Sequence, residues 1–273
     1  MLNRFRQTVF QSFHNTGRIV TKGLRTLKKD PQIAAYPYIA AIFIATTLPI
    51  VNGLVFGLWN KLWHSTFFSV VDNTPQDFRI LLGVGSFSFF YTALVTAYFS
   101  YAASAAVLQK LEGRPTSFLY GLRVVLRRFG RVTKFALVSI FFFPLGIIAQ
   151  YRKLPKGIFG VIISSFTLHT PQIAPEVVSG RSGLLLTIRN SIEILGKVRY
   201  EGVIIRVAMI IAVLLLGLTV FLPPLIEKYW LDSETANLVG WLAGLLLGAT
   251  SYVALKVVGT VFTTTLYYEA KNK

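Results

Sequence analysis

Residues 113–134 read GRPTSFLYGLRVVLRRFGRVTK, a basic run without acidic residues between two long apolar segments. Its apolar residues recur every three or four positions, which predicts an amphipathic helix. These residues are Phe118, Leu122, Val125, Phe129 and Val132. A basic amphipathic helix between two apolar segments is expected to lie flat on the cytoplasmic leaflet of a membrane.

The cations of this run are predicted to face anionic lipid. Arg123, Arg127 and Arg131 are four apart and are therefore expected to share one side of the helix. A later segment, 184–199, repeats the pattern. The candidate headgroup ligands are Arg114, Arg123, Arg127, Arg128, Arg131 and Arg189.

The composition is typical of a membrane protein. With 53% hydrophobic and 14% charged residues, the 273-residue chain is too apolar for an ordinary soluble domain. Its net charge of +17 would suggest nucleic acid in a soluble protein. Here the cations lie in short segments between apolar runs, so we expect no nucleic-acid partner and interpret the charge as an orientation signal.

Residues 1–30 are predicted to form a basic amphipathic N-terminal helix. Apolar and basic residues share this segment at near-helical spacing, and Asp30-Pro31 supplies a cap and a first-turn proline for the next helix. The segment lacks a compact apolar core and a cleavage site, so no signal peptide is expected. Because it has no acid before Asp30, a mitochondrial-type presequence is the alternative.

Residues 31–273 are predicted to form an all-α bundle of six transmembrane helices with amphipathic helices on its cytoplasmic face. About 20 apolar residues cross a bilayer. The predicted spans are 33–59, 80–108, 132–149, 157–178, 203–226 and 238–268. The fourth is interrupted between His169 and Glu176, where two prolines lie.

The distribution of Lys and Arg predicts the orientation. Both termini and two of the loops hold 21 of these residues, the other three loops hold 6, and Lys256 lies within a span. The positive-inside rule therefore places both termini in the cytoplasm of a multi-pass protein, in the plasma (inner) membrane. Bacterial, archaeal and organellar membranes all fit this pattern.

Glycines spaced by four form the sharpest motif. Gly240, Gly244 and Gly248 make a bare stripe on the sixth predicted span, where another helix can approach closely. Packing within the bundle is the simpler interpretation, and oligomerisation or a pore-lining hinge is the alternative.

Lys256, His169 and Glu176 are the intramembrane polar candidates. Lys256 is the only charge well inside a predicted span, and such a residue marks either a structural contact or an ion or substrate site. It is expected either to pair with Glu176 or to extend its stem toward the headgroups. The broken fourth span either lines a binding site or ends at the interface.

The chain is not expected to be an enzyme. It has no cysteine, its three histidines are scattered, and neither a phosphate-binding loop nor a nucleophile turn is present. We therefore expect no catalytic, metal or cofactor site.

Several short motifs resemble an uncharacterised family of six-span prokaryotic membrane proteins. They are Leu27–Pro31 leading into Ala35-Tyr36-Pro37, Gly113–Phe118 followed by Gly121-Leu122-Arg123, Ile188–Ser191, and the closing Leu266-Tyr267-Tyr268. Similar patterns occur in the membrane domain of some glycerophosphodiester phosphodiesterases. The resemblance implies multi-pass topology and brings no activity, because the soluble phosphodiesterase domain has no counterpart here.

The sequence thus predicts a non-catalytic membrane scaffold or accessory subunit that binds anionic lipid, a protein partner or a second copy of itself. The alternative is a transporter or channel with a polar site around Lys256 and the broken fourth span.

Overall fold

The computed structural model describes residues 2–63, 81–138, 174–180, 183–198, 234–272 and parts of 200–218. These residues are helical apart from short turns, so the prediction of an all-α chain is confirmed for the part of the chain that is described. The elements are α1 (Leu2–Lys29), α2 (Gln32–Trp63), the π-helical η2 (Leu81–Gly85), α4 (Ser86–Leu111), α5 (Phe118–Arg127), α8 (Leu184–Gly196) and α10 (Glu234–Lys271).

Two of the described helices are long and apolar enough to cross a membrane. They cover Gln32–Leu58 and Gly83–Leu111. On the first, large side chains such as Ile42, Ile50 and Leu54 are exposed, as expected for a helix that faces lipid rather than water. Most of the predicted spans 132–149, 157–178 and 203–226 lie outside the described residues, whereas α10 runs without a break through 238–268.

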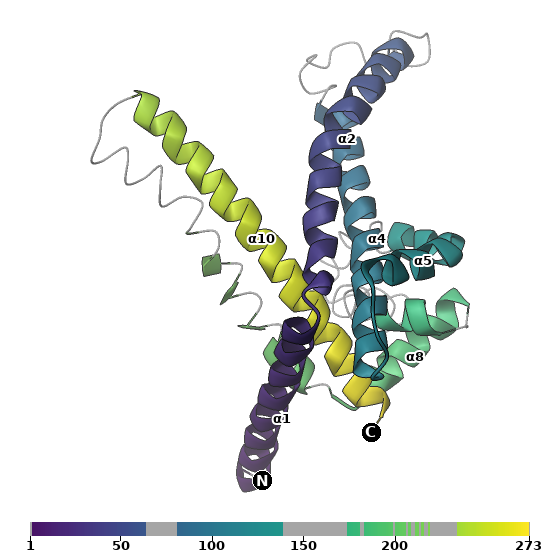
Figure 1. Ribbon diagram of the computed structural model, residues 1–273, viewed down its shortest axis with the longest axis vertical. Coiled ribbons are helices and arrows are strands. Elements are labelled where there is room, and N and C mark those ends of the chain that lie inside the picture. Colours follow the sequence, from purple (N-terminus) through teal and green to yellow (C-terminus); the bar gives the residue numbers. More distant parts are fainter. Residues whose placement is uncertain are drawn as a thin grey trace.

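Helix α4 is the centre of the fold. It runs beside α2, carries α5 at its C-terminal end, and is crossed there by α10, which diverges from α2 toward its own N-terminus (Figure 1). The buried part of α4 is rich in small residues between Ala102 and Ala106, which let neighbouring backbones approach closely. Thr264 of α10 donates a hydrogen bond from Oγ1 to Ser104 Oγ at 3.2 Å within this contact.

Gly113 ends α4 with a reversal of the chain. Its φ of +79° lies in the left-handed region that glycine adopts without steric cost. Its N–H donates to the carbonyl of Lys110 at 3.0 Å, and the N–H of Arg114 donates to that of Gln109 at 3.1 Å. This pair of bonds is the Schellman motif, and it aims the chain back across the end of α4.

Helix α5 is anchored by Tyr36 of α2. The Tyr36 hydroxyl donates to the carbonyl of Phe118 at 2.7 Å, and the two rings stack with centroids 4.7 Å apart. Ser117 caps the helix by accepting the N–H of Tyr120 at 3.2 Å. Gly121 faces α2 and α4 so closely that a Cβ there would clash with Tyr36 Oη and the carbonyl oxygen of Ala102.

Helix α1 packs against α10 through a mostly small and polar face. Ser12, Thr16, Ile19, Gly23 and Thr26 are buried along it at spacings of three and four. Glu269 of α10 binds both Lys22 and Arg18, the latter at 3.8 Å. The apolar side chains Phe13 and Leu24 point outward instead, so α1 keeps an exposed apolar stripe next to its cations.

Candidate functional site

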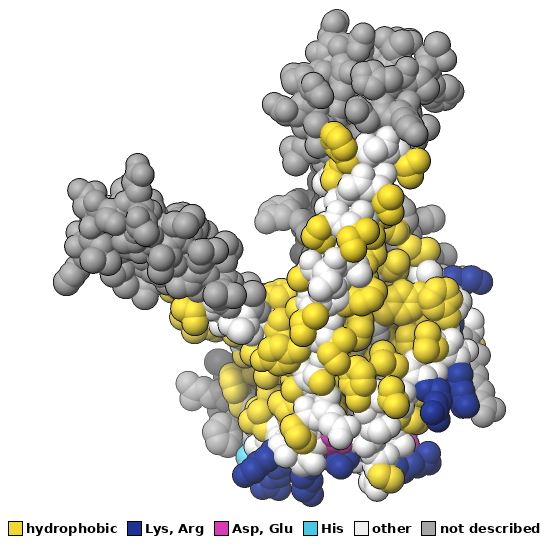
Figure 2. Space-filling view, turned by 45° about the horizontal axis from the view of Figure 1, so that its top comes forward, with side chains coloured by type: hydrophobic (Ala, Val, Ile, Leu, Met, Phe, Trp, Pro, Cys, Tyr) yellow, Lys and Arg dark blue, Asp and Glu magenta, His cyan; other side chains and the backbone are white. Residues whose placement is uncertain are grey.

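Lys and Arg side chains gather at one end of the molecule, beside and below a broad apolar face (Figure 2). The N-terminal end of α1 and the C-terminal end of α10 lie at this same end (Figure 1). This segregation is the distribution expected for a protein that has its apolar face in lipid and its cations at a headgroup layer.

Helix α5 carries apolar and basic side chains on its outer surface. Leu119, Leu126 and Phe129, the last just beyond its end, are 65%, 69% and 56% exposed. Arg123 and Arg127 are exposed beside them, and neither has a hydrogen-bond or ion-pair partner among the described residues. Free cations next to exposed apolar side chains are what a helix in a membrane interface presents.

Arg128 and Arg131 have a different role. Both donate from Nη1 to the carbonyl oxygen of Gly180, at 2.5 and 2.6 Å respectively. Arg131 also donates from Nη2 to Thr187 Oγ1 at 2.7 Å. Gly180 follows the helical segment 174–179, so the two guanidinium groups cap its C-terminal end and favourably oppose its dipole.

The prediction that Arg131 shares a side with Arg123 and Arg127 is therefore wrong. The helix is interrupted at Arg128, whose φ and ψ are −113° and 23°, before helical structure resumes at 129–138. The break changes the direction in which the side chains beyond it point around the helix axis. As a result, the side chain of Arg131 points toward Gly180, as that of Arg128 does. Burial, followed by the nearby charge of Arg128, lowers the pKa of Arg131, and the charge of Glu176 opposes this shift.

Glu176 joins the same cluster to α10. It is buried and accepts a hydrogen bond from the Tyr267 hydroxyl. Lys256 does not contact it, because Lys256 is exposed on α10 with Nζ 5.4 Å from the centre of the Tyr252 ring. His169 lies outside the described residues, so the role of the broken fourth span stays a prediction.

The remaining candidates are dispersed. Arg114 pairs with Glu112 at 3.8 Å, and both side chains are exposed. Arg189 is exposed on α8. Gly244 and Gly248 are buried on α10. The burial of Gly240 is not among the features that the structure describes.

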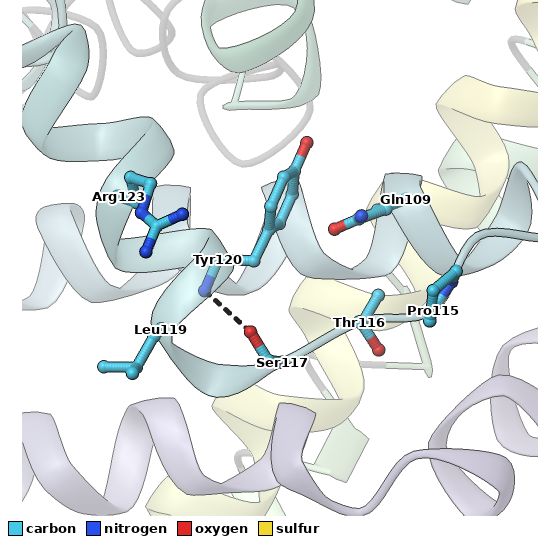
Figure 3. Close-up of a pocket in the computed structure, with 7 residues that line it drawn as sticks. All are labelled: Gln109, Pro115, Thr116, Ser117, Leu119, Tyr120 and Arg123. Atoms are coloured by element: carbon cyan, nitrogen blue, oxygen red, sulfur yellow. Dashed lines mark hydrogen bonds between the residues drawn. The ribbon is translucent and has the colours of Figure 1, made fainter.

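A pocket that the sequence did not predict opens between α4 and α5 (Figure 3). It has a volume of about 280 Å³ and its polar lining comes from Gln109, Thr116, Ser117, Tyr120 and Arg123. Gln109 Oε1 and Thr116 Oγ1 are fully buried and have no hydrogen-bond partner within the described ranges. No local pattern marks this site, because the Gly113 reversal is what brings Thr116 next to Gln109.

No family model, no curated protein and no solved structure matches this chain.

Proposed function

We propose that this chain is a multi-pass membrane protein that serves as a scaffold or accessory subunit and binds anionic lipid at its cytoplasmic face. The observation that carries the proposal is the outer surface of α5, where Arg123 and Arg127, which have no partner in the described part of the chain, lie beside exposed Leu119 and Leu126. A soluble protein would expose these leucines to water at a cost, whereas at a membrane interface they enter the acyl layer.

Six spans with both termini in the cytoplasm remain our proposed topology. Two described helices have the required length and composition, and α10 supplies a further long helix. Both ends of the described chain lie at the basic end of the molecule, as an even number of crossings requires. The 21-to-6 distribution of Lys and Arg favours the cytoplasmic side for that end.

The lipid-binding proposal is tested by charge removal on α5. Each cation at an anionic surface contributes about 1 kcal/mol, so Arg123→Gln with Arg127→Gln should weaken a preference for anionic lipid by about 2 kcal/mol. The measurement is competition between anionic and zwitterionic lipid for the purified protein reconstituted in nanodiscs. The matched control, Lys at both positions, keeps the charge and should keep the preference.

A preference that survives the double Gln variant at low salt would overturn the proposal. Raising the salt concentration should reduce the wild-type preference, because surface electrostatics are screened over a Debye length of about 10 Å at 0.1 M.

A further inference from the structure

Helix α1 buries small polar side chains and exposes large apolar ones. Among its described residues, Ile19 is the only large apolar side chain on the buried face, which otherwise consists of serine, threonine and glycine. Phe13 and Leu24 point away from that face and are 57% and 49% exposed. A helix stabilised only by packing on its own chain buries its large apolar side chains, because their removal from water is the main driving force. The outer side of α1 therefore has the composition of a contact surface.

The outer apolar residues form one stripe along α1. Phe13, Gly17, Val20 and Leu24 follow at spacings of four, three and four, which places them on one face of the helix. Nothing lies within 4 Å of the position that a Cβ of Gly17 would take, so the middle of the stripe is open. At 1.5 Å per residue the stripe is about 16 Å long. This length suits contact with another amphipathic helix.

Cations lie next to the stripe, and no acidic residue of α1 balances them. Residues 1–29 contain neither Asp nor Glu. Arg25 and Lys28 are exposed close to Leu24 and have no partner in the part of the chain that the structure describes. A binding surface with carboxylates beside apolar side chains would complement this arrangement, whereas a second copy of α1 would bring cations against cations.

The direction of α1 argues against lipid as the occupant of the stripe. Helix α1 extends past α8 and the C-terminal end of α10 and runs in nearly the same direction as α2, whereas a helix in a membrane interface lies across the spanning helices (Figure 1). The proposed interfacial helix α5 is bound to Tyr36, within α2. Phe13 lies on the other side of Asp30, about 25 Å away along α1. The potential of an anionic leaflet decays over roughly 8 Å, so it does not reach this end of the stripe.

We propose that the outer stripe of α1 binds an acidic amphipathic helix of a cytosolic protein. The apolar side chains of the partner contact Phe13, Val20 and Leu24, and its carboxylates pair with Arg25 and Lys28. This inference rests on the proposed function, which places this end of the molecule in the cytoplasm, and it names the class of protein that the scaffold holds. The apolar anchors supply the affinity, while the charges select the partner and speed its association.

Binding is measured on the full-length protein in phosphatidylcholine nanodiscs, which contain no anionic lipid. The probe is a designed helical peptide with leucine on one face and glutamate on the other. A peptide of the same composition in scrambled order, without an apolar face, is the matched control. Wild-type protein should bind the amphipathic probe and not the scrambled one. Equal binding of the two peptides would overturn the proposal, because charge alone would then account for the interaction.

Variants assign the binding to the stripe. Phe13→Gln with Leu24→Gln retains helix-forming residues and should weaken probe binding by about tenfold or more, since two half-exposed apolar side chains lose their contact. Leu186→Gln is the matched control, because Leu186 is 52% exposed on α8, and it should bind the probe as wild type does. Arg25→Gln with Lys28→Gln should weaken binding by about fivefold and reduce its dependence on salt. Unchanged binding in the Phe13, Leu24 variant would overturn the proposal.

A photo-crosslinking residue in place of Phe13 identifies the occupant in intact cells. The expected adduct joins α1 to a soluble protein, at a segment with apolar residues on one helical face and acidic residues on the other. The same crosslinker in place of Leu186 should not give this adduct. An adduct at position 13 with phospholipid, with nucleic acid or with a second copy of this chain would overturn the proposal, as would the absence of any adduct.

The outcomes separate this inference from the proposed lipid binding. If wild-type protein prefers anionic lipid but binds the probe equally well without the apolar anchors of α1, only this inference fails. If wild-type protein shows no preference for anionic lipid and probe binding still requires Phe13 and Leu24, lipid binding at α5 fails and the protein contact at α1 stands.

Discussion

Gly121 sets the distance between α5 and the rest of the molecule. The Tyr36 hydroxyl and the carbonyl of Ala102 occupy the space that a side chain would need. Tyr36 also binds the carbonyl of Phe118, so the approach of α5 and its hydrogen bond to α2 depend on one another.

Gly121→Ala should therefore displace α5 and destabilise the protein. Overpacking of a tight contact costs about 1–3 kcal/mol, against the roughly 1 kcal/mol that alanine gains over glycine in a helix. The measurement is thermal unfolding of the purified protein in detergent. Gly130→Ala is the matched control, since nothing lies within 4 Å of its Cβ position, and it should be neutral or stabilising. Equal melting temperatures for the two variants would show that the Tyr36 contact adapts without cost.

At the scale of elements, a pair of cations holds the basic segment to the helix at 174–179. Arg128 and Arg131 share the carbonyl of Gly180, and Arg131 reaches Thr187 close to the start of α8. Glu176 of the same segment binds Tyr267 of α10. The segment thus connects α5, α8 and α10 through polar side chains, while its Ala174, Val177 and Val178 are buried in the hydrophobic core.

Arg131→Gln should loosen this connection. Hydrogen bonds from a charged donor contribute about 1.5–3 kcal/mol, and glutamine cannot reproduce the planar fork. Arg131→Lys should also fail to restore stability, because an ammonium group cannot bind Gly180 and Thr187 in the same geometry. Limited proteolysis and thermal unfolding would measure the effect, with Arg127→Gln expected to behave like wild type. Stability retained in Arg131→Lys would indicate that charge alone holds the segment.

At the scale of the whole molecule, Lys and Arg side chains gather at one end, next to a broad apolar face (Figure 2), and the proposed topology places that end on the cytoplasmic side. Glu112 is exposed at the basic end, next to the Gly113 reversal. Thr66 lies in the loop that the sequence places on the opposite side.

Single cysteines at these two positions test the topology. The protein has no native cysteine, so a membrane-impermeant thiol reagent reports only on the introduced residue. In intact cells Thr66→Cys should react, and Glu112→Cys should react only after the membrane is opened. Reaction of both from the same side would contradict the six-span arrangement.

Local patterns were sufficient to predict that the described part of the chain is all-α and that it contains helices long and apolar enough to cross a membrane. The three-to-four-residue period of Phe118, Leu122 and Val125 determines a helix, and the length of apolar runs such as 33–59 determines that a helix can cross a bilayer. These properties depend on residues close together in the chain, so the sequence alone reveals them.

The tertiary structure decided which cations have partners among the residues that it describes. Arg123 and Arg131 look equivalent in the sequence, but the break at Arg128 turns one outward and the other toward Gly180, 49 residues further along. The pocket likewise depends on the reversal at Gly113 and on Tyr36, which holds Phe118 from 82 residues away. Contacts between residues so distant in the chain leave no periodic signal in either segment, and only the packed arrangement of the helices determines them.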